Sequence, residues 1–169
     1  MRLAILSDTH DNLWALRAAL PQIAAADAVI HCGDLCSPFM LRELGGGVGG
    51  KPVHMVWGNN EGDVLLMTRL LPQFPHVTLH GALAQLEFDG LKVAVNHYPE
   101  IAKGLALSGL YDLVCFGHNH TASEEKAGNG VLLNPGEVMG LMGRRTFAFF
   151  ETRTRVVEFV EIPLSVITF

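Results

Sequence analysis

Two histidines, His118 and His120, stand one residue apart directly after an apolar run that ends at Phe116. Alternate residues of an extended chain point to the same side, so both imidazoles can reach one common centre. Imidazole nitrogens are ordinary ligands of divalent transition metals. Two of eight histidines can also fall this close together by chance on a polar loop. By itself, the pair leaves a metal site and a polar loop equally open.

Four other apolar runs also end in polar residues that can bind a metal ion. In open α/β sheets, ligands bind just outside the carboxyl ends of the strands. We therefore expect five segments, far apart in sequence, to meet at one sheet edge. Together they offer two carboxylates, one amide oxygen and four imidazoles, from Asp8, His10, Asp34, Asn59, His97, His118 and His120.

Seven ligands exceed the number that one tetrahedral ion accepts. They suit two divalent ions about 3.5 to 4 Å apart that share a carboxylate. Two such ions carry four positive charges, so Asp8 and Asp34 leave the centre positive and attractive to phosphate. Each residue alone also fits a structural role, such as a turn at Asp8 or a helix cap at Asp34. The coincidence of five clusters favours the metal site.

The remaining histidines have other expected roles. His31 and His54 lie within apolar runs, where a histidine is usually packed in the core. His76 and His80 lie in a predicted turn region, where solvated polar residues are normal.

Length and composition predict a single domain over residues 1–169. The formal charge of -5 argues against binding of long nucleic acid. Without a signal-like start or a membrane-length apolar run, and with three cysteines, the chain is expected to be cytoplasmic and not to bind membranes. Only 17% of residues are charged and 49% are hydrophobic, which suits self-association as a homo-oligomer, with residues 163–169 as one candidate surface.

Strands and helices are expected to alternate through the first two thirds of the chain. In the last third, turn residues separate short strands, as in β-hairpins. This pattern predicts a mixed sheet, or two sheets packed face to face between helices. The glycine-rich segment 45–50 is expected to be a flexible loop. Expected strands cover 2–6, 28–32, 53–57, 91–95 and 112–116, then 83–88, 131–133, 146–151 and 156–162; expected helices cover 13–26, kinked or split at Pro21, and 38–44, 64–71 and 100–107.

The ordered motifs resemble those of the calcineurin-like metallophosphoesterases, and most of all their small single-domain prokaryotic phosphodiesterase branch. The resemblance extends from the first strand to about Gly140. The motifs are Asp8-x-His10, Gly33-Asp34, Gly58-Asn59-Asn60-Glu61, Asn96-His97 and Gly117-His118-Asn119-His120, followed by Asn134-Pro135-Gly136.

The resemblance implies an α/β fold, a four-layer α-β-β-α sandwich with two mixed β-sheets flanked by helices. It implies two divalent metal ions that share Asp34. Manganese is favoured, and iron, nickel, zinc and cobalt also fit such ligands. One ion is assigned to Asp8, His10, Asp34 and His120, and the other to Asp34, Asn59, His97 and His118.

Two positions depart from the family pattern. Many larger relatives have a histidine that can protonate the leaving oxygen where this chain has Asn60. An amide can donate a hydrogen bond to a phosphoryl oxygen, but it cannot act as a general acid. Asn96 replaces the usual glycine before His97, a change we expect to be tolerated because the histidine side chain does the binding.

The expected activity is hydrolysis of a small phosphodiester by in-line attack of a metal-bound hydroxide, with Asn60 as the catalytic contact to the substrate. Diesters with acidic leaving groups should react faster than alkyl monoesters. Two alternatives remain: a catalytically weak, metal-binding scaffold for protein interactions, as in the small retromer subunit, and a phosphomonoesterase. A scaffold has no need to keep all seven ligands.

Overall fold

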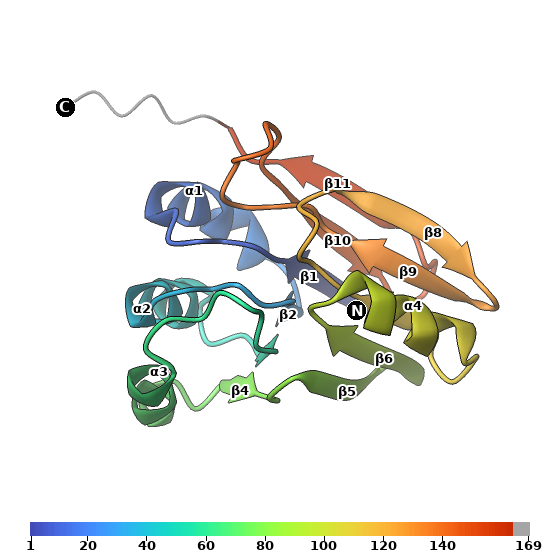
Figure 1. The fold of residues 1–169 in the computed structure, drawn as a ribbon, viewed down its shortest axis with the longest axis horizontal. Helices are drawn as coiled ribbons and strands as arrows, with labels where there is room; N and C mark the ends of the chain where they lie inside the picture. Colours follow the sequence, from blue (N-terminus) through green and yellow to red (C-terminus); the bar gives the residue numbers. More distant parts are fainter. Residues whose placement is uncertain (164–169) are drawn as a thin grey trace.

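Two mixed β-sheets lie face to face, with helices on the outer face of each sheet (Figure 1). The computed structural model describes residues 1–163. Apart from Pro163, the expected self-association segment lies outside the described residues. The first sheet has the order β11 (Val157–Glu161), β10 (Thr146–Glu151), β1 (Arg2–Leu6), β2 (Ala28–His31), β3 (Val53–Met55) and β4 (Val77–Leu79). The second has the order β5 (Leu83–Phe88), β6 (Leu91–Asn96), β7 (Leu113–Cys115), β9 (Gly130–Asn134) and β8 (Ser123–Ala127).

Helices α1 (Leu13–Ile23), α2 (Pro38–Gly47) and α3 (Val64–Leu70), with the 3-10 turn η1 (Leu71–Gln73), pack on the first sheet, and α4 (Pro99–Leu107) packs on the second. The expected four-layer α-β-β-α sandwich is therefore confirmed. None of the helices in residues 1–163 combines the length and the apolar character needed to cross a lipid bilayer.

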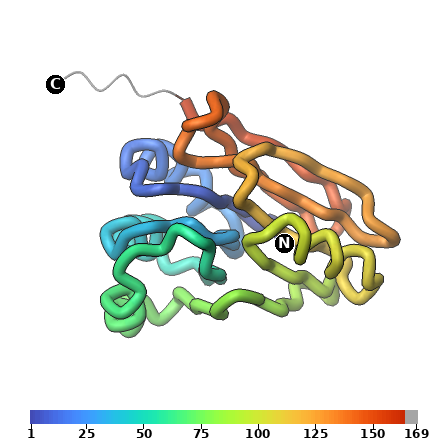
Figure 2. Tube along the Cα trace, viewed as in Figure 1, coloured from blue at the N-terminus to red at the C-terminus, as the bar shows by residue number. Residues whose placement is uncertain are grey.

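The chain builds the first sheet from both of its ends. Strands β1 to β4 are parallel, as βαβ connections require, whereas β10 returns antiparallel beside β1 (Figure 2). The inner faces of the sheets share one apolar core, in which Leu3 and Ile5 of β1 join Val95 and Cys115 of the second sheet. Strands β2 and β7 are buried along their whole length, and β1 is buried from Leu3 onward, which explains their apolar runs.

Two local expectations were wrong. Pro21 does not split α1, which continues to Ile23, because the proline lies on the exposed side of the helix and one missing backbone hydrogen bond is tolerated there. Asn12 caps that helix as expected, accepting a hydrogen bond from the backbone N of Ala15 at 3.1 Å. The expected flexible loop at 45–50 begins too early, because its first three glycines form the last turn of α2. Gly45 lies so close to Phe74 that a Cβ atom would overlap the ring.

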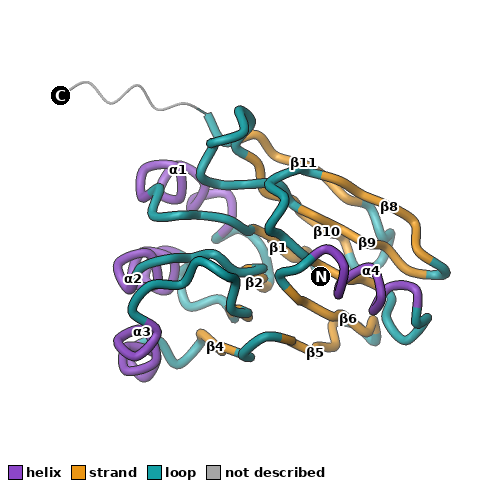
Figure 3. The backbone as a smooth tube through the Cα atoms, in the orientation of Figure 1, coloured by secondary structure: helices purple, strands orange, loops and turns teal. Residues whose placement is uncertain are grey.

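The loops that follow strands of both sheets meet at one edge (loops in teal, Figure 3). Backbone hydrogen bonds join them directly: the N of Asp8 donates to the O of Gly33 at 3.1 Å, and the N of Gly117 donates to the O of His97 at 3.0 Å. The polar residues after β1, β2, β6 and β7 therefore share one place.

Candidate metal centre

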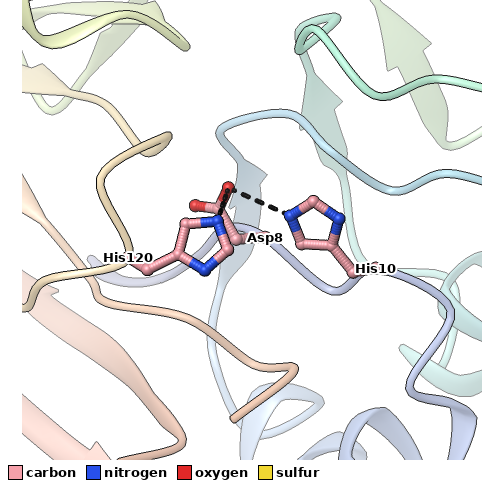
Figure 4. A group of neighbouring side chains, drawn as sticks. All are labelled: Asp8, His10 and His120. Atoms are coloured by element: carbon pink, nitrogen blue, oxygen red, sulfur yellow. Dashed lines mark ion pairs between the residues drawn. The ribbon is translucent and has the colours of Figure 1, made fainter. Parts of the chain in front are cut away.

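The first group of candidate ligands surrounds the carboxylate of Asp8, which is buried (Figure 4). His10 follows the same strand, and His120 comes from the loop after β7. The Nε2 atoms of His10 and His120 lie 3.6 and 3.5 Å from Oδ1 of Asp8. Each ring thus points one nitrogen toward the same carboxylate oxygen.

The second group surrounds the amide oxygen of Asn59. Nε2 of His97 lies 2.9 Å from this oxygen, and Nδ1 of His118 lies 2.7 Å from it. His97 is buried, whereas Asn59 and His118 are exposed. This group therefore opens to solvent, with a neutral oxygen where the first group has a carboxylate.

Asp34 joins the two groups. Its Oδ2 lies 3.4 Å from Nε2 of His10 and 3.5 Å from Nε2 of His97. Its other oxygen, Oδ1, accepts a hydrogen bond from the backbone N of Asn60 at 2.8 Å, which fixes the carboxylate in place. All seven residues that the sequence singled out therefore form one continuous cluster.

The donor spacing fits divalent cations. Ligand atoms about 2.1 Å from an ion lie about 3.0 to 3.5 Å from one another, close to the separations around Asp8 and Asp34. Nε2 of His10 is also buried without a hydrogen-bond partner, although two carboxylates face it. A cation among these atoms would satisfy that nitrogen, since buried polar atoms normally have a partner.

Hydrogen bonds behind two of the rings set their orientation. Nδ1 of His97 donates to the carbonyl of Cys32 at 2.9 Å, and Nδ1 of His120 donates to Oε2 of Glu137 at 2.7 Å. A proton on Nδ1 leaves the lone pair of Nε2 directed into the centre. Carboxylates and carbonyls in this position are typical behind metal-binding histidines.

Glu137 supports the ring of His120 from behind. The side chain is fully buried, and its other oxygen accepts a hydrogen bond from the backbone N of Met142 at 2.5 Å. The sequence separation of 17 between His120 and Glu137 carries no signal for this contact. Its position after Asn134-Pro135-Gly136 was the only available indication.

The backbone of this edge is strained. Left-handed conformations are uncommon for residues with a Cβ atom and gather at functional sites. Seven of the nine non-glycine residues with positive φ in the described chain belong to these loops, and five of the seven are candidate ligands. The five are Asp8, His10, Asp34, His118 and His120.

Two glycines allow the loops to approach the carboxylates. A Cβ atom on Gly58 would overlap the side chain of Asp34, and one on Gly117 would overlap Ser7 and the carboxylate of Asp8. These motif glycines are therefore required by close packing around the acids, not by turn geometry.

Charges within the centre shift several pKa values. The nearby carboxylate of Asp8 is the largest influence on His10 and raises its pKa. Burial opposes the charged form of His97, but contacts with Asp34 outweigh it and raise the pKa. Burial also opposes ionisation of Asp34, but the nearby ring of His97 and the hydrogen bond from the Asn60 backbone outweigh burial and lower the pKa of the carboxyl. The lowered pKa keeps the Asp34 carboxyl ionised, so it attracts positive charge.

Asn60 lies at the exposed rim of the centre, with its side-chain Nδ2 3.0 Å from Nδ1 of His10. The thiol of Cys36, to which the sequence assigned no role, lies 3.4 Å from the same nitrogen. Burial, first of all, raises the pKa of Cys36 to about 12, so the group is a neutral thiol. Asn96, the other departure from the family pattern, holds the loop of His97, since its side chain donates to the O of Ala82 and accepts from the N of Tyr98.

The other histidines lie outside the cluster. His31 is buried, as expected, and contacts the hydroxyl of Thr9 at 3.2 Å. His54 lies 3.0 Å from His80, so His80 is not simply a solvated turn residue. Nε2 of His76 donates to the carbonyl of Gly45 at 2.8 Å.

Residues 1–155 match the calcineurin-like phosphoesterase superfamily domain. Over 170 residues the chain is 31% identical to the phosphodiesterase MJ0936 of Methanocaldococcus jannaschii, with 98% of this chain and all of that protein covered. It is 28% identical over 155 residues to the probable metallophosphoesterase YsnB of Bacillus subtilis, with 88% of this chain and 82% of that protein covered.

Solved structures give the same result. The structure of an archaeal phosphodiesterase has a TM-score of 0.88 at 29% identity and covers 95% of this chain and 99% of its own. A Vps29 variant from Entamoeba histolytica has a TM-score of 0.69 at 16% identity, with 96% of this chain and 100% of that chain covered, which shows a shared fold only. The expected phosphoric ester hydrolase family is thus confirmed: the chain belongs to the calcineurin-like phosphoesterase superfamily.

Proposed function

We propose that this protein hydrolyses small phosphodiesters with the help of two divalent cations held by the seven clustered residues. The observation that carries this proposal is the position of Asp34. One oxygen of its carboxylate lies within 3.5 Å of a histidine from each group, as a ligand shared by two ions would. Asp8, His10 and His120 would complete one ion's shell, and Asn59, His97 and His118 the other.

Two divalent cations in these positions would supply positive charge to the phosphoryl oxygens and would lower the pKa of a bound water molecule so that it can attack phosphorus. Manganese is the cation we favour. The carboxylates of Asp8 and Asp34 offset half of the four positive charges, so the neutral amide of Asn59 matters: a third acid there would weaken the attraction for an anionic substrate.

The histidines have to be neutral to bind a cation, and the chain provides for this at two of them. Cys32 and Glu137 accept the Nδ1 protons of His97 and His120, which leaves both Nε2 atoms free. Because only a neutral imidazole binds a cation, cation binding should weaken as the pH falls.

Asn60 would contact the substrate from the rim. Nδ2 of Asn60 lies 3.0 Å from Nδ1 of His10. If Nε2 of His10 binds a cation, Nδ1 carries the proton, and the Asn60 amide would turn so that its oxygen accepts that proton. The NH2 group of Asn60 is then free to donate a hydrogen bond to a phosphoryl oxygen. Because an amide cannot supply a proton, the leaving group has to depart without one from this side chain. We therefore expect a preference for diesters with acidic leaving groups.

This proposal is tested on protein that has been stripped with a chelator and reloaded with manganese. We expect bis(p-nitrophenyl) phosphate to be hydrolysed at least about 100-fold faster than an alkyl phosphomonoester, since proton donation contributes about 10²–10⁴-fold. In Asn60→His the ratio of the diester rate to the monoester rate should be smaller. Faster turnover of the alkyl monoester by the unmodified protein would contradict the assigned role of Asn60. Absence of diester hydrolysis with any divalent metal would favour the scaffold alternative.

A further inference from the structure

A cavity of about 460 Å³ opens beside the candidate metal centre. His120 forms part of its wall, so the cavity and the centre share a side chain. The other walls come from the loop before β8, the loop before β10 with the first residue of that strand, and the middle of β11. Its volume is in the range of small-molecule sites.

Two large apolar side chains face this cavity while remaining open to solvent. Met142 is 72% exposed and Phe159 is 39% exposed. A phenyl ring and a flexible thioether both form favourable contacts with a flat aromatic group. Such contacts suit a heterocyclic base better than an alkyl chain, because a flat aromatic ring can stack on a phenyl ring.

The cavity also carries positive charge. Among the described residues that line it, Arg144 is the only one with a formal charge at neutral pH. It pairs with Glu161 at 3.2 Å, but the two side chains are 78% and 64% exposed, so water screens the pair and an anion can replace the acid. A guanidinium binds phosphate with two parallel hydrogen bonds, which a carboxylate partner at one nitrogen does not prevent.

We propose that this cavity binds the nucleoside part of the substrate and that Arg144 binds a second phosphate, which makes short nucleotide diesters the substrate class. This inference rests on the proposed phosphodiesterase function and adds its specificity. The scissile phosphate lies at the metal centre next to His120, the base lies against Phe159 and Met142, and a terminal phosphate reaches Arg144.

The test compares two dinucleotides that differ only in a terminal 5′-phosphate, with bis(p-nitrophenyl) phosphate as the reference diester. For the unmodified protein loaded with manganese, we expect kcat/KM to be about tenfold or more higher for the phosphorylated dinucleotide, the scale of one charge-assisted contact. Arg144→Gln should bring the ratio close to one, mainly through KM. Glu161→Gln should keep or raise the ratio, because it frees Arg144.

The matched control is Arg153→Gln, an exposed arginine in the turn after β10, at the end of that strand away from the cavity. It should leave the ratio unchanged. Phe159→Ala should raise KM for both dinucleotides without changing their ratio.

Two outcomes separate the proposals. A ratio near one in the unmodified protein, or a ratio that Arg144→Gln does not alter, would overturn this inference while hydrolysis of bis(p-nitrophenyl) phosphate still supports the proposed function. If the unmodified protein hydrolyses none of the three diesters, the proposed function fails and this inference fails with it.

Discussion

Two histidine pairs in this protein have nearly the same ring separation and opposite surroundings. The ring centroids of His10 and His120 are 5.0 Å apart, and those of His54 and His80 are 5.2 Å apart. Carboxylates face the first pair, and its backbone is left-handed at both residues. In the second pair the rings hydrogen-bond to each other, and Phe88 packs against His54.

The pKa directions record this difference. The nearby carboxylate of Asp8 raises the pKa of His10, whereas burial lowers the pKa of His54 and of His80. The acids, not the proximity of two imidazoles, make the first pair a place for positive charge. The second pair is better explained by a structural role, in which the two rings pack against each other and against Phe88.

The largest effect should follow from removing the shared acid. Asp34→Asn keeps the shape of the side chain but removes the charge between the two groups. A bridging ligand stabilises both cations and the transition state by several kcal/mol, so we expect at least about a thousandfold loss of kcat/KM on bis(p-nitrophenyl) phosphate with manganese. His80→Gln, in the second pair, should stay within about twofold. Equal losses in the two variants would remove the distinction between the pairs.

A second prediction concerns His31, where burial outweighs nearby acids and lowers the pKa to about 4 from an ordinary 6.5. Between these values the unfolded chain binds more protons than the folded one, so the free energy of unfolding falls as the pH is lowered from about 6.5 to 4. The pKa shift of His31 accounts for a decrease of about 3 kcal/mol in the free energy of unfolding over this pH range. Urea denaturation of the chelator-treated protein should show a weaker decline from pH 7.5 to 4.5 in His31→Gln.

Comparison with the variant is needed because His10 and His97 have raised pKa values and change stability in the opposite direction when no cation is bound. Their contribution to the free energy of unfolding is present below about pH 6.5 and is lost as the pH rises. The difference between the two proteins isolates His31. Parallel pH profiles would mean that burial of this ring is not what separates it from the first pair.

A smaller effect is expected behind His120. Glu137→Gln keeps a hydrogen-bond acceptor but removes the charge that supports the ring, and changes of this kind typically lower metal affinity about 10- to 100-fold. Isothermal titration with manganese measures this directly. Glu158→Gln serves as the control, because Glu158 pairs with Arg2 at the surface, at the opposite end of β1 from Asp8. Unchanged affinity in Glu137→Gln would reduce Glu137 to a packing role.

Much of this arrangement could be predicted from sequence because it follows from chain direction. Apolar runs buried on both faces end abruptly in polar residues, and parallel strands bring those ends to one edge. Looking for polar residues at the carboxyl ends of apolar strands located all seven candidate ligands and the strands that they follow. It also separated His31 and His54 from the site, since both lie inside apolar runs.

What sequence reasoning missed depends on contacts between distant segments. Strand β8 reads Ser-Glu-Glu-Lys-Ala, is mostly exposed, and becomes a strand only by pairing with β9 at the sheet edge. Strand β4 has three residues, too few for a periodic signal. The contact between Glu137 and His120 and the one between Asn60 and His10 arise from loop packing that no local pattern encodes.

The most direct test of the central claim is anomalous diffraction from crystals of the protein grown with manganese. We expect two peaks about 3.5 to 4 Å apart on either side of the Asp34 carboxylate, one beside His10 and His120 and the other beside His97 and His118. No peak at Asp34, or a single ion that leaves one group of histidines without a metal, would contradict the two-cation centre.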